Sequence, residues 1–221
     1  MIHFREVSKH YDNQTAIRKI SFSIDKGEMI FITGPSGSGK STLLKLIYMA
    51  ERPDEGNITV ADWEIDKLKE SRIPLLRRSI GVVFQDFRLL NNRNIFENIA
   101  LALRIRGVND ERELKSRVFE TLKSVNLRHK SDNFPETLSG GEQQRVAIAR
   151  AIVSEPVIIL ADEPTGNVDS DTSEGIMKAF KDSNAKGTTI LIATHNRDLF
   201  RNSGRRVFKL DSGSFTGEEI G

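Results

Sequence analysis

Residues 34–41 read Gly34-Pro35-Ser36-Gly37-Ser38-Gly39-Lys40-Ser41, and this stretch decides the fold of the chain. It follows an apolar segment, residues 29–33, and precedes residues 41–50, whose leucines and isoleucine recur at helical spacing. A glycine-rich loop between a strand and a helix, ending in Lys-Ser, is typical of the loops that hold phosphates on backbone amides. The stretch therefore predicts an α/β protein with a largely parallel sheet.

The loop also predicts roles for its side chains. Lys40 would neutralise the β and γ oxygens of a nucleotide, and the Ser41 hydroxyl would hold Mg²⁺. A chance glycine-rich turn is the alternative, and the flanking strand and helix argue against it. The nucleotide-binding residues predicted here are Gly34, Pro35, Ser36, Gly37, Ser38, Gly39, Lys40, Ser41 and Thr42.

Three further apolar segments, 80–84, 157–161 and 189–193, predict strands that are buried on both faces of the same sheet. The second of them ends in Asp162 and Glu163, at the strand end where open α/β sheets bind ligands. Because neighbouring side chains on a strand point in opposite directions, Asp162 would serve Mg²⁺ while Glu163 polarises the attacking water. Pro164 is predicted to keep Glu163 extended. Two strand-end charges without a chemical role are the alternative.

Three more residues are candidates through their position. His195 follows segment 189–193 and would contact the γ-phosphate. Gln85 follows segment 80–84 and would offer its amide oxygen to Mg²⁺ or to the water. Tyr11 would stack on an adenine, with ordinary packing as the alternative.

A second helix start of the same kind lies at residues 138–145, Leu138-Ser139-Gly140-Gly141-Glu142-Gln143-Gln144-Arg145. Ser139 and Glu142 have the spacing of a capping box, in which each side chain satisfies an amide of the first helical turn. Gly140 and Gly141 have no Cβ, so an anion can approach these amides closely. An ordinary helix cap is the alternative, but one nucleotide rarely needs two such sites.

The rest of the chain predicts one domain over residues 1–221 with a helical insertion. Residues 20–24 alternate between apolar and polar types, which predicts a half-buried strand. Strand patterns disappear between residues 87 and 155, while helical periodicity marks residues 95–106, 111–125 and 140–154. Residues 212–221 are predicted to form a frayed tail.

Composition limits the possible partners. Charged residues make up 29% of the 221 residues, yet the net charge is only +2, and acidic and basic residues are interleaved, so we expect no nucleic-acid partner. The chain has no cysteine, and its histidines lack metal-ligand spacing, so we expect no metal other than Mg²⁺. The longest apolar run is far shorter than the roughly 20 residues that a transmembrane helix needs. These features favour an intracellular setting.

Together the glycine loop, Gln85, residues 138–141, 157–163 and 166–169, and His195 resemble the ATP-binding-cassette (ABC) ATPase family, and the likeness covers nearly the whole chain. It implies an ATPase with a mainly parallel core sheet, an antiparallel β part and a helical subdomain at about residues 87–155. ATP and Mg²⁺ are the implied ligands. Glu142 departs from the family pattern, because many members have glutamine there.

The resemblance also implies that two copies of the chain sandwich two ATP molecules head to tail. Lys40, Ser41 and Glu163 of one copy would face residues 139–141 of the other, with Asp169 running along the interface. We expect each active site to be shared between the two copies.

An integral membrane partner is implied as well, with the chain bound peripherally at the cytoplasmic face of the inner membrane. The apolar candidates to contact it are Phe87, Leu89, Leu90 and Phe96; internal packing is the alternative for at least two of them. Within the family, residues 81–90 and 161–167 resemble bacterial cell-division ATPases. Lipoprotein and macrolide exporters share residues 138–145, so an exporter subunit is an alternative function.

Two other functions are less consistent with the sequence. A soluble cassette acting on DNA or ribosomes would be expected to carry a long coiled coil or a second cassette, and neither is present. A nucleotide or small-molecule kinase would explain residues 34–41 but would leave residues 138–145 without a role.

Overall fold

The computed structural model describes residues 1–12, 14–166 and 168–221, so Asn167, which belongs to the family resemblance, lies outside the described residues. The strands, in chain order, are β1 (Ile2–Tyr11), β2 (Gln14–Ile24), β3 (Met29–Thr33), β4 (Glu55–Val60), β5 (Trp63–Glu64), β6 (Ile80–Val83), β7 (Ile158–Asp162), β8 (Thr189–Ala193), β9 (Arg206–Asp211) and β10 (Ser214–Ile220). The α-helices are α1 (Lys40–Ile47), α2 (Ile73–Arg78), α3 (Ile95–Ile105), α4 (Glu111–Ser124), α5 (Gly140–Ile152) and α6 (Ser170–Ala185). Short 3₁₀ turns occupy Glu70–Arg72, Arg128–Lys130, Pro135–Thr137 and Arg197–Leu199.

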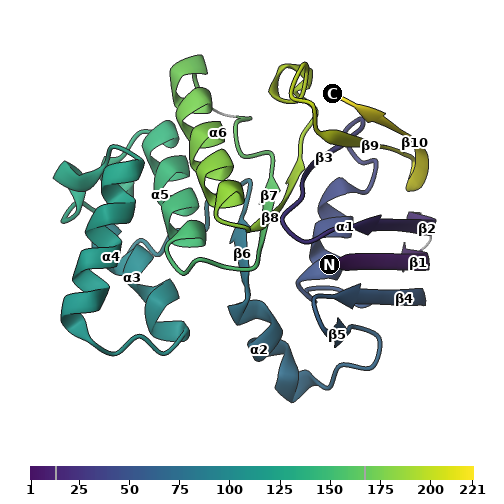
Figure 1. Cartoon of the computed structure of the whole chain (residues 1–221), viewed down its shortest axis with the longest axis horizontal. Coiled ribbons are helices and arrows are strands. Elements are labelled where there is room, and N and C mark those ends of the chain that lie inside the picture. The colour runs from purple at the N-terminus through teal and green to yellow at the C-terminus, as the bar shows by residue number, and fades with distance from the viewer. Residues whose placement is uncertain (13, 167) are drawn as a thin grey trace.

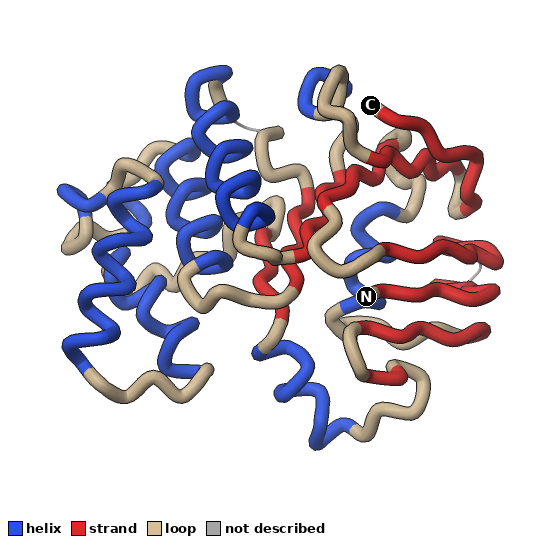
Figure 2. Tube along the Cα trace, in the orientation of Figure 1, coloured by secondary structure: helices blue, strands red, loops and turns tan. Residues whose placement is uncertain are grey.

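Two sheets organise these strands. A six-stranded sheet has the order β10-β9-β3-β8-β7-β6, in which β9, β3, β8, β7 and β6 run parallel and β10 is antiparallel to β9. A four-stranded antiparallel sheet has the order β2-β1-β4-β5. The strands gather on one side of the molecule and helices α3, α4 and α5 on the other (Figures 1 and 2). The expected combination of a mainly parallel sheet, an antiparallel part and a helical part is confirmed.

The central strands separate two hydrophobic cores. On β3, Ile30 and Ile32 enter the core shared with α1 and the antiparallel sheet, while Met29 and Phe31 enter the core shared with α6. Successive side chains of a strand point to opposite faces, so a strand covered on both faces must be apolar throughout. This explains why the buried strands read as continuous apolar runs in the sequence.

A third core lies among the helices between β6 and β7, a stretch that the structure describes without a gap and in which it has no strand. Residues four apart meet on one helix face: Ile95, Ile99 and Leu103 on α3 pack with Leu114, Val118 and Leu122 on α4. Four of the helices begin with a side-chain N-cap. Asn94, Asp110, Ser139 and Asp169 accept hydrogen bonds from the first turns of α3, α4, α5 and α6. These helices lie within residues 87–155, and the bounds of that subdomain stay a prediction.

The prediction of a frayed C-terminal tail is wrong. Residues of β10 pair with β9, Glu218 bonds Arg206 at 2.6 Å, and the Phe215 ring packs 5.0 Å from that of Phe208. The strand is mostly exposed, so its sequence lacks the apolar alternation from which strands are predicted. Among the described residues, no helix is both long and apolar enough to cross a membrane.

Candidate active site

The glycine loop ends in the first turn of α1, and Lys40 folds back over it. Its Nζ donates to the carbonyls of Gly34 at 2.8 Å and Pro35 at 2.9 Å, and the side chain is almost fully buried. The N-cap of α1 is Gly39, with a φ of 103° and no side-chain cap. The first amides of α1 are therefore left for a ligand, at the positive end of the helix dipole.

Two of the loop glycines are required by close backbone contacts. A Cβ on Gly34 would lie 2.0 Å from the Leu210 carbonyl oxygen, and one on Gly39 would lie 2.5 Å from that of Ala16. Both residues also have positive φ values, which side chains other than hydrogen disfavour. Strands β9 and β2 thus hold the loop in shape.

The loop forms part of a cavity of ≈ 520 Å³ at the carboxyl ends of β3, β6, β7 and β8. Most of the predicted site residues meet there although they come from distant parts of the sequence. Those lining the cavity are Pro35, Ser36, Gly37, Gly39, Lys40, Ser41, Thr42, Gln85, Asp162, Glu163 and His195. Gly34 and Ser38 belong to the same loop without lining it.

Asp162 closes β7 beside Ser41, and its environment suits a cation. Its Oδ1 is buried and, among the described residues, has no hydrogen-bond partner. Burial raises the pKa of Asp162, and a hydrogen bond from Ser41 opposes this rise without cancelling it. A bound cation would relieve this lack of partners, since oxygen ligands are those that Mg²⁺ prefers.

The side chain of Glu163 is nearly buried and points to the end of β8. It accepts hydrogen bonds from the Thr194 hydroxyl at 3.1 Å and from the His195 amide at 3.1 Å, and lies 2.8 Å from His195 Nδ1. The expectation of an extended Glu163 is wrong, because its φ is +47°. Its amide bonds the Ala193 carbonyl at 2.9 Å, and this contact with β8 outweighs the local preference that Pro164 imposes.

Some predicted residues lie outside the cavity. Tyr11, on β1, is 37% exposed. Burial and the Glu51 carboxylate raise the pKa of Tyr11, and a hydrogen bond with Thr42, in the first turn of α1, opposes them. Its stacking on adenine stays a prediction.

Sequence reasoning missed three contributors. Ala16 of β2 lines the cavity, and the Thr194 hydroxyl orients Glu163. The third, Gly213 in the turn between β9 and β10, donates its amide to the Ser38 carbonyl at 3.1 Å. Thr194 directly follows the apolar segment 189–193, so the strand-end argument that selected His195 could have selected Thr194 as well. The contacts of Ala16 and Gly213 depend on tertiary packing and have no local signal in the sequence.

The second glycine-rich helix start, at α5, has a different geometry. Ser139 accepts from the Glu142 amide at 3.3 Å, and Glu142 accepts from the Ser139 amide at 3.0 Å, so the predicted capping box is present. Lys130 lies 2.5 Å from Glu142 and lowers the pKa of that carboxyl. Ser139, Gly140 and Gly141 do not line the cavity described above. A Cβ on Gly140 would meet no atom of the other described residues within 4 Å, its chain neighbours and the backbone of its own helix aside.

These features define a class of protein. A phosphate-binding loop with a strand-end carboxylate pair, a helical insertion and a second glycine-rich helix start are the marks of an ABC cassette, and residues 17–166 match the family described as ABC transporter. The chain belongs to this family and is an ATPase.

Particular relatives sharpen this assignment. The chain is 48% identical over 220 residues to the cell division ATP-binding protein FtsE of Streptococcus pneumoniae, covering 99% of the chain and 95% of the relative. It is 46% identical over 218 residues to FtsE of Escherichia coli K12, covering 98% of each. The dimeric structure of the ATP-binding cassette MJ0796 bound to ADP and Pi is 37% identical, with a TM-score of 0.94 over 100% of this chain and 98% of that one. The predicted family and its likeness to cell-division members are confirmed.

Proposed function

We propose that this ATPase works as a homodimer in which each active site is shared between two copies. One observation carries the proposal: the start of α5 is a phosphate-ready helix terminus that lies outside the cavity of its own chain, and Gly140 faces open space there. No contact among the described residues requires glycine at this position. A phosphate held by the loop of a second copy does explain it, and MJ0796, which has the same fold, is a dimer.

Within each shared site, Lys40 and the amides at the start of α1 would hold the phosphates of ATP. Ser41, Gln85 and Asp162 would hold Mg²⁺, which when bound supplies positive charge to the phosphate oxygens. Glu163 would take the proton of the attacking water, and His195, 2.8 Å from it, would contact the γ-phosphate. Ser139, Gly140 and Gly141 of the other copy would complete the site.

A complementation experiment tests the shared site. Lys40→Ala disables the loop, and Ser139→Arg fills the space before α5, so each variant alone is expected to lose hydrolysis, while Ser139→Arg keeps ATP binding. In a mixed dimer of these two variants one of the two sites pairs an intact loop with an intact α5. Mixing the two inactive proteins should therefore restore ATPase activity, measured as phosphate release.

The matched control carries both substitutions on one chain and is mixed with unsubstituted chain. In that mixed dimer each site contains one damaged half, so the mixed dimers should be inactive. If Ser139→Arg alone retains full hydrolysis, the start of α5 is merely a well-capped helix, and the shared site is wrong.

We further propose that the chain is the ATPase subunit of an FtsE-type complex, bound at the cytoplasmic face of the inner membrane to an FtsX-like membrane protein and acting in cell division. Its support is the identity of 44–48% to proteins named FtsE over nearly the full chain. The partner would dock near Gln85. Leu89 and Phe96 pack against the third core, whereas Leu90 is 37% exposed, which leaves Leu90 as the better contact residue.

Leu90→Glu tests this contact. We expect weaker binding of a purified FtsX-like membrane protein and unchanged affinity for ATP, because Leu90 does not line the nucleotide cavity. Co-purification measures the first property and nucleotide titration the second. Equal loss of both would mean that the substitution only unfolds the region.

A further inference from the structure

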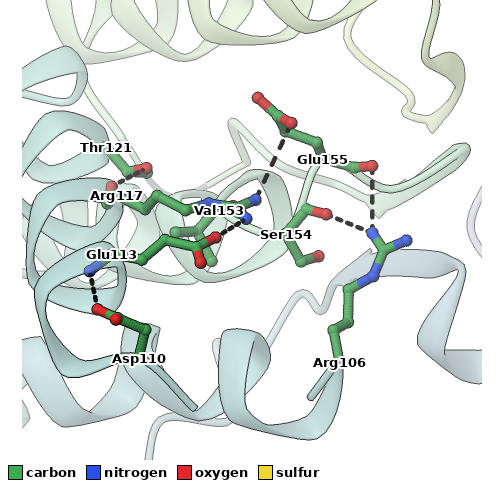
Figure 3. Close-up of polar contacts among 8 residues, drawn as sticks. All are labelled: Arg106, Asp110, Glu113, Arg117, Thr121, Val153, Ser154 and Glu155. Carbon is green, nitrogen blue, oxygen red and sulfur yellow. Dashed lines mark hydrogen bonds and ion pairs between the residues drawn. The ribbon is translucent and has the colours of Figure 1, made fainter. Parts of the chain in front are cut away.

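The two ends of α5 differ in the charge that suits them. A helix carries partial positive charge at its N-terminus and partial negative charge at its C-terminus, so cations stabilise only the C-terminal end. At that end, Arg117 donates to the Val153 carbonyl at 3.1 Å, directly after the last residue of α5. Arg106 donates to the carbonyls of Ser154 and Glu155 (Figure 3). Both cations therefore lie where the helix dipole favours them.

The N-terminal end of α5 also has a cation beside it, which the dipole does not favour. Lys130 Nζ lies 2.5 Å from Glu142 Oε1. The other carboxylate oxygen of Glu142 accepts from the Ser139 amide at 3.0 Å, so both charges lie at the first turn of α5. The side chain of Lys130 is 29% exposed and that of Glu142 17%, so water screens this pair less than it screens a pair on the open surface.

The fold of the helical part holds this lysine in place. Leu127, three residues before it, is buried in the third core. The Ser131 carbonyl, directly after it, accepts from the Phe96 amide of α3 at 2.9 Å. These contacts fix both ends of the 3₁₀ turn Arg128–Lys130. Lys130 is therefore brought to α5 by the backbone around it and not by the ion pair alone.

Within a single chain, the charge of this lysine has little effect. The Glu142 carboxylate is itself the kind of group that a helix N-terminus favours, and it closes the capping box without a cation. A partly exposed ion pair adds little stability. Neutralising Glu142 matters when a second anion approaches the same helix start, because an unpaired carboxylate would repel that anion.

We propose that Lys130 is a positioning residue of the shared active site: it holds and neutralises Glu142, so that the phosphate of ATP on the other copy meets no net negative charge at residues 139–141. The inference rests on the shared site proposed above and adds a residue to it. Lys130 acts through Glu142 and is not itself a phosphate ligand. The effect is electrostatic, and it is strong because closing the dimer excludes water from between the charges.

The stability of the ATP-bound dimer tests this role. In the Glu163→Gln protein, in which bound ATP is expected to persist, light scattering gives the dissociation constant of the dimer. Lys130→Met added to it leaves the Glu142 carboxylate unpaired beside the phosphate. We expect the dissociation constant to rise about tenfold at low salt, and less at high salt. An unchanged constant would overturn the proposal.

Glu142→Gln breaks the same ion pair but is expected to have the opposite result. It leaves the charge of Lys130 unopposed, so the dimer should be at least as tight as that of the Glu163→Gln protein. Combined with Lys130→Met, it should restore the dimer, because no carboxylate is then left to repel the phosphate. If the two single substitutions weaken the dimer alike, the ion pair only supports the fold of the helix start, and the proposal is wrong.

Two further substitutions serve as controls in the same background. Lys130→Arg keeps the positive charge and should keep the dimer. Lys115→Met removes an exposed lysine from α4 and should have no effect, and an effect as large as that of Lys130→Met would overturn the specific role of Lys130. The affinity of the monomer for ATP should be equal in all variants, because neither Lys130 nor Glu142 lines the nucleotide cavity of its own chain.

The Glu163→Gln protein without further substitution separates this inference from the shared site itself. If that protein stays monomeric with bound ATP, the shared site is wrong, and the role of Lys130 is wrong with it. If that protein dimerises and its Lys130→Met variant dimerises equally well, only the role of Lys130 is wrong.

Discussion

The two glycine-rich helix starts differ in what satisfies their amides. At α1 the N-cap is Gly39, with no side-chain cap, and the amides face a cavity lined by Lys40, Asp162 and Glu163. At α5 the cap is Ser139 in a closed capping box, and neither Ser139 nor the two glycines after it line that cavity. One start is incomplete without a ligand, and the other is stable alone.

The glycines differ in the same way. Gly39 is required by its own chain, because a Cβ there would lie 2.5 Å from the Ala16 carbonyl. Gly140 is not, because a Cβ there would meet nothing within 4 Å. Gly175 on α6 has the same room, so what distinguishes Gly140 is its place in the first turn of α5, where a bound anion would approach the amides.

Replacing glycine by alanine at each helix start gives the largest expected difference, in the free energy of unfolding. Gly39→Ala should destabilise the chain by at least about 2 kcal/mol, since the left-handed conformation alone costs about 1–2 kcal/mol and the clash adds to it. Nucleotide binding should be lost as well. Gly140→Ala should leave stability unchanged or raise it by up to about 1 kcal/mol, because alanine is the better helix residue. Chemical denaturation measures both.

Hydrolysis then separates the two explanations of Gly140. If a phosphate of a second copy approaches this amide, Gly140→Ala should lower the ATPase rate of a fully stable protein. If the Gly140→Ala protein is stable and keeps the original ATPase rate, then no phosphate of a second copy approaches this amide, and the α5 start has no role in hydrolysis.

The sequence predicts the first start better than its surroundings. The strands β3 and β8 have the predicted bounds, and α1 begins at Lys40, one residue before its predicted start, because the signals are local: apolar runs, and glycines at fixed spacing. The reasons for Gly34 and Gly39 are not local, since they are contacts with Leu210 and Ala16. Strand β1 escaped prediction because Glu6, with a φ of +49°, bulges and breaks the alternation between Phe4 and Val7.

Glu163→Gln should have the next largest effect, on the hydrolysis rate, and it tests whether the α1 and α5 starts of two copies meet. Loss of the general base is expected to lower the hydrolysis rate about 10²–10⁴-fold. ATP that binds without being hydrolysed should then hold two copies together, with the α1 start of each against the α5 start of the other. Light scattering with ATP should report a dimer. A Glu163→Gln protein that stays monomeric with bound ATP would contradict this arrangement.

The smallest expected effect concerns how the α5 start is held. Glu142 accepts from the Ser139 amide and pairs with Lys130, and these contacts lower the pKa of its carboxyl. A lowered pKa in the folded state means that the pairing stabilises the protein above the unfolded value of about 4.3, and that this contribution is lost as the pH falls through the folded value. Glutamine keeps an oxygen for the capping box but has no charge for Lys130.

Glu142→Gln should therefore cost about 0.5 kcal/mol at pH 7.5, and the difference from the unsubstituted chain should shrink as the pH approaches 4. Urea midpoints across this range measure it, with Lys130→Met as the matched partner. The two substitutions together should cost no more than either alone, because both remove the same ion pair. Costs that add, or that do not change with pH, would show that packing rather than charge holds this helix start in place.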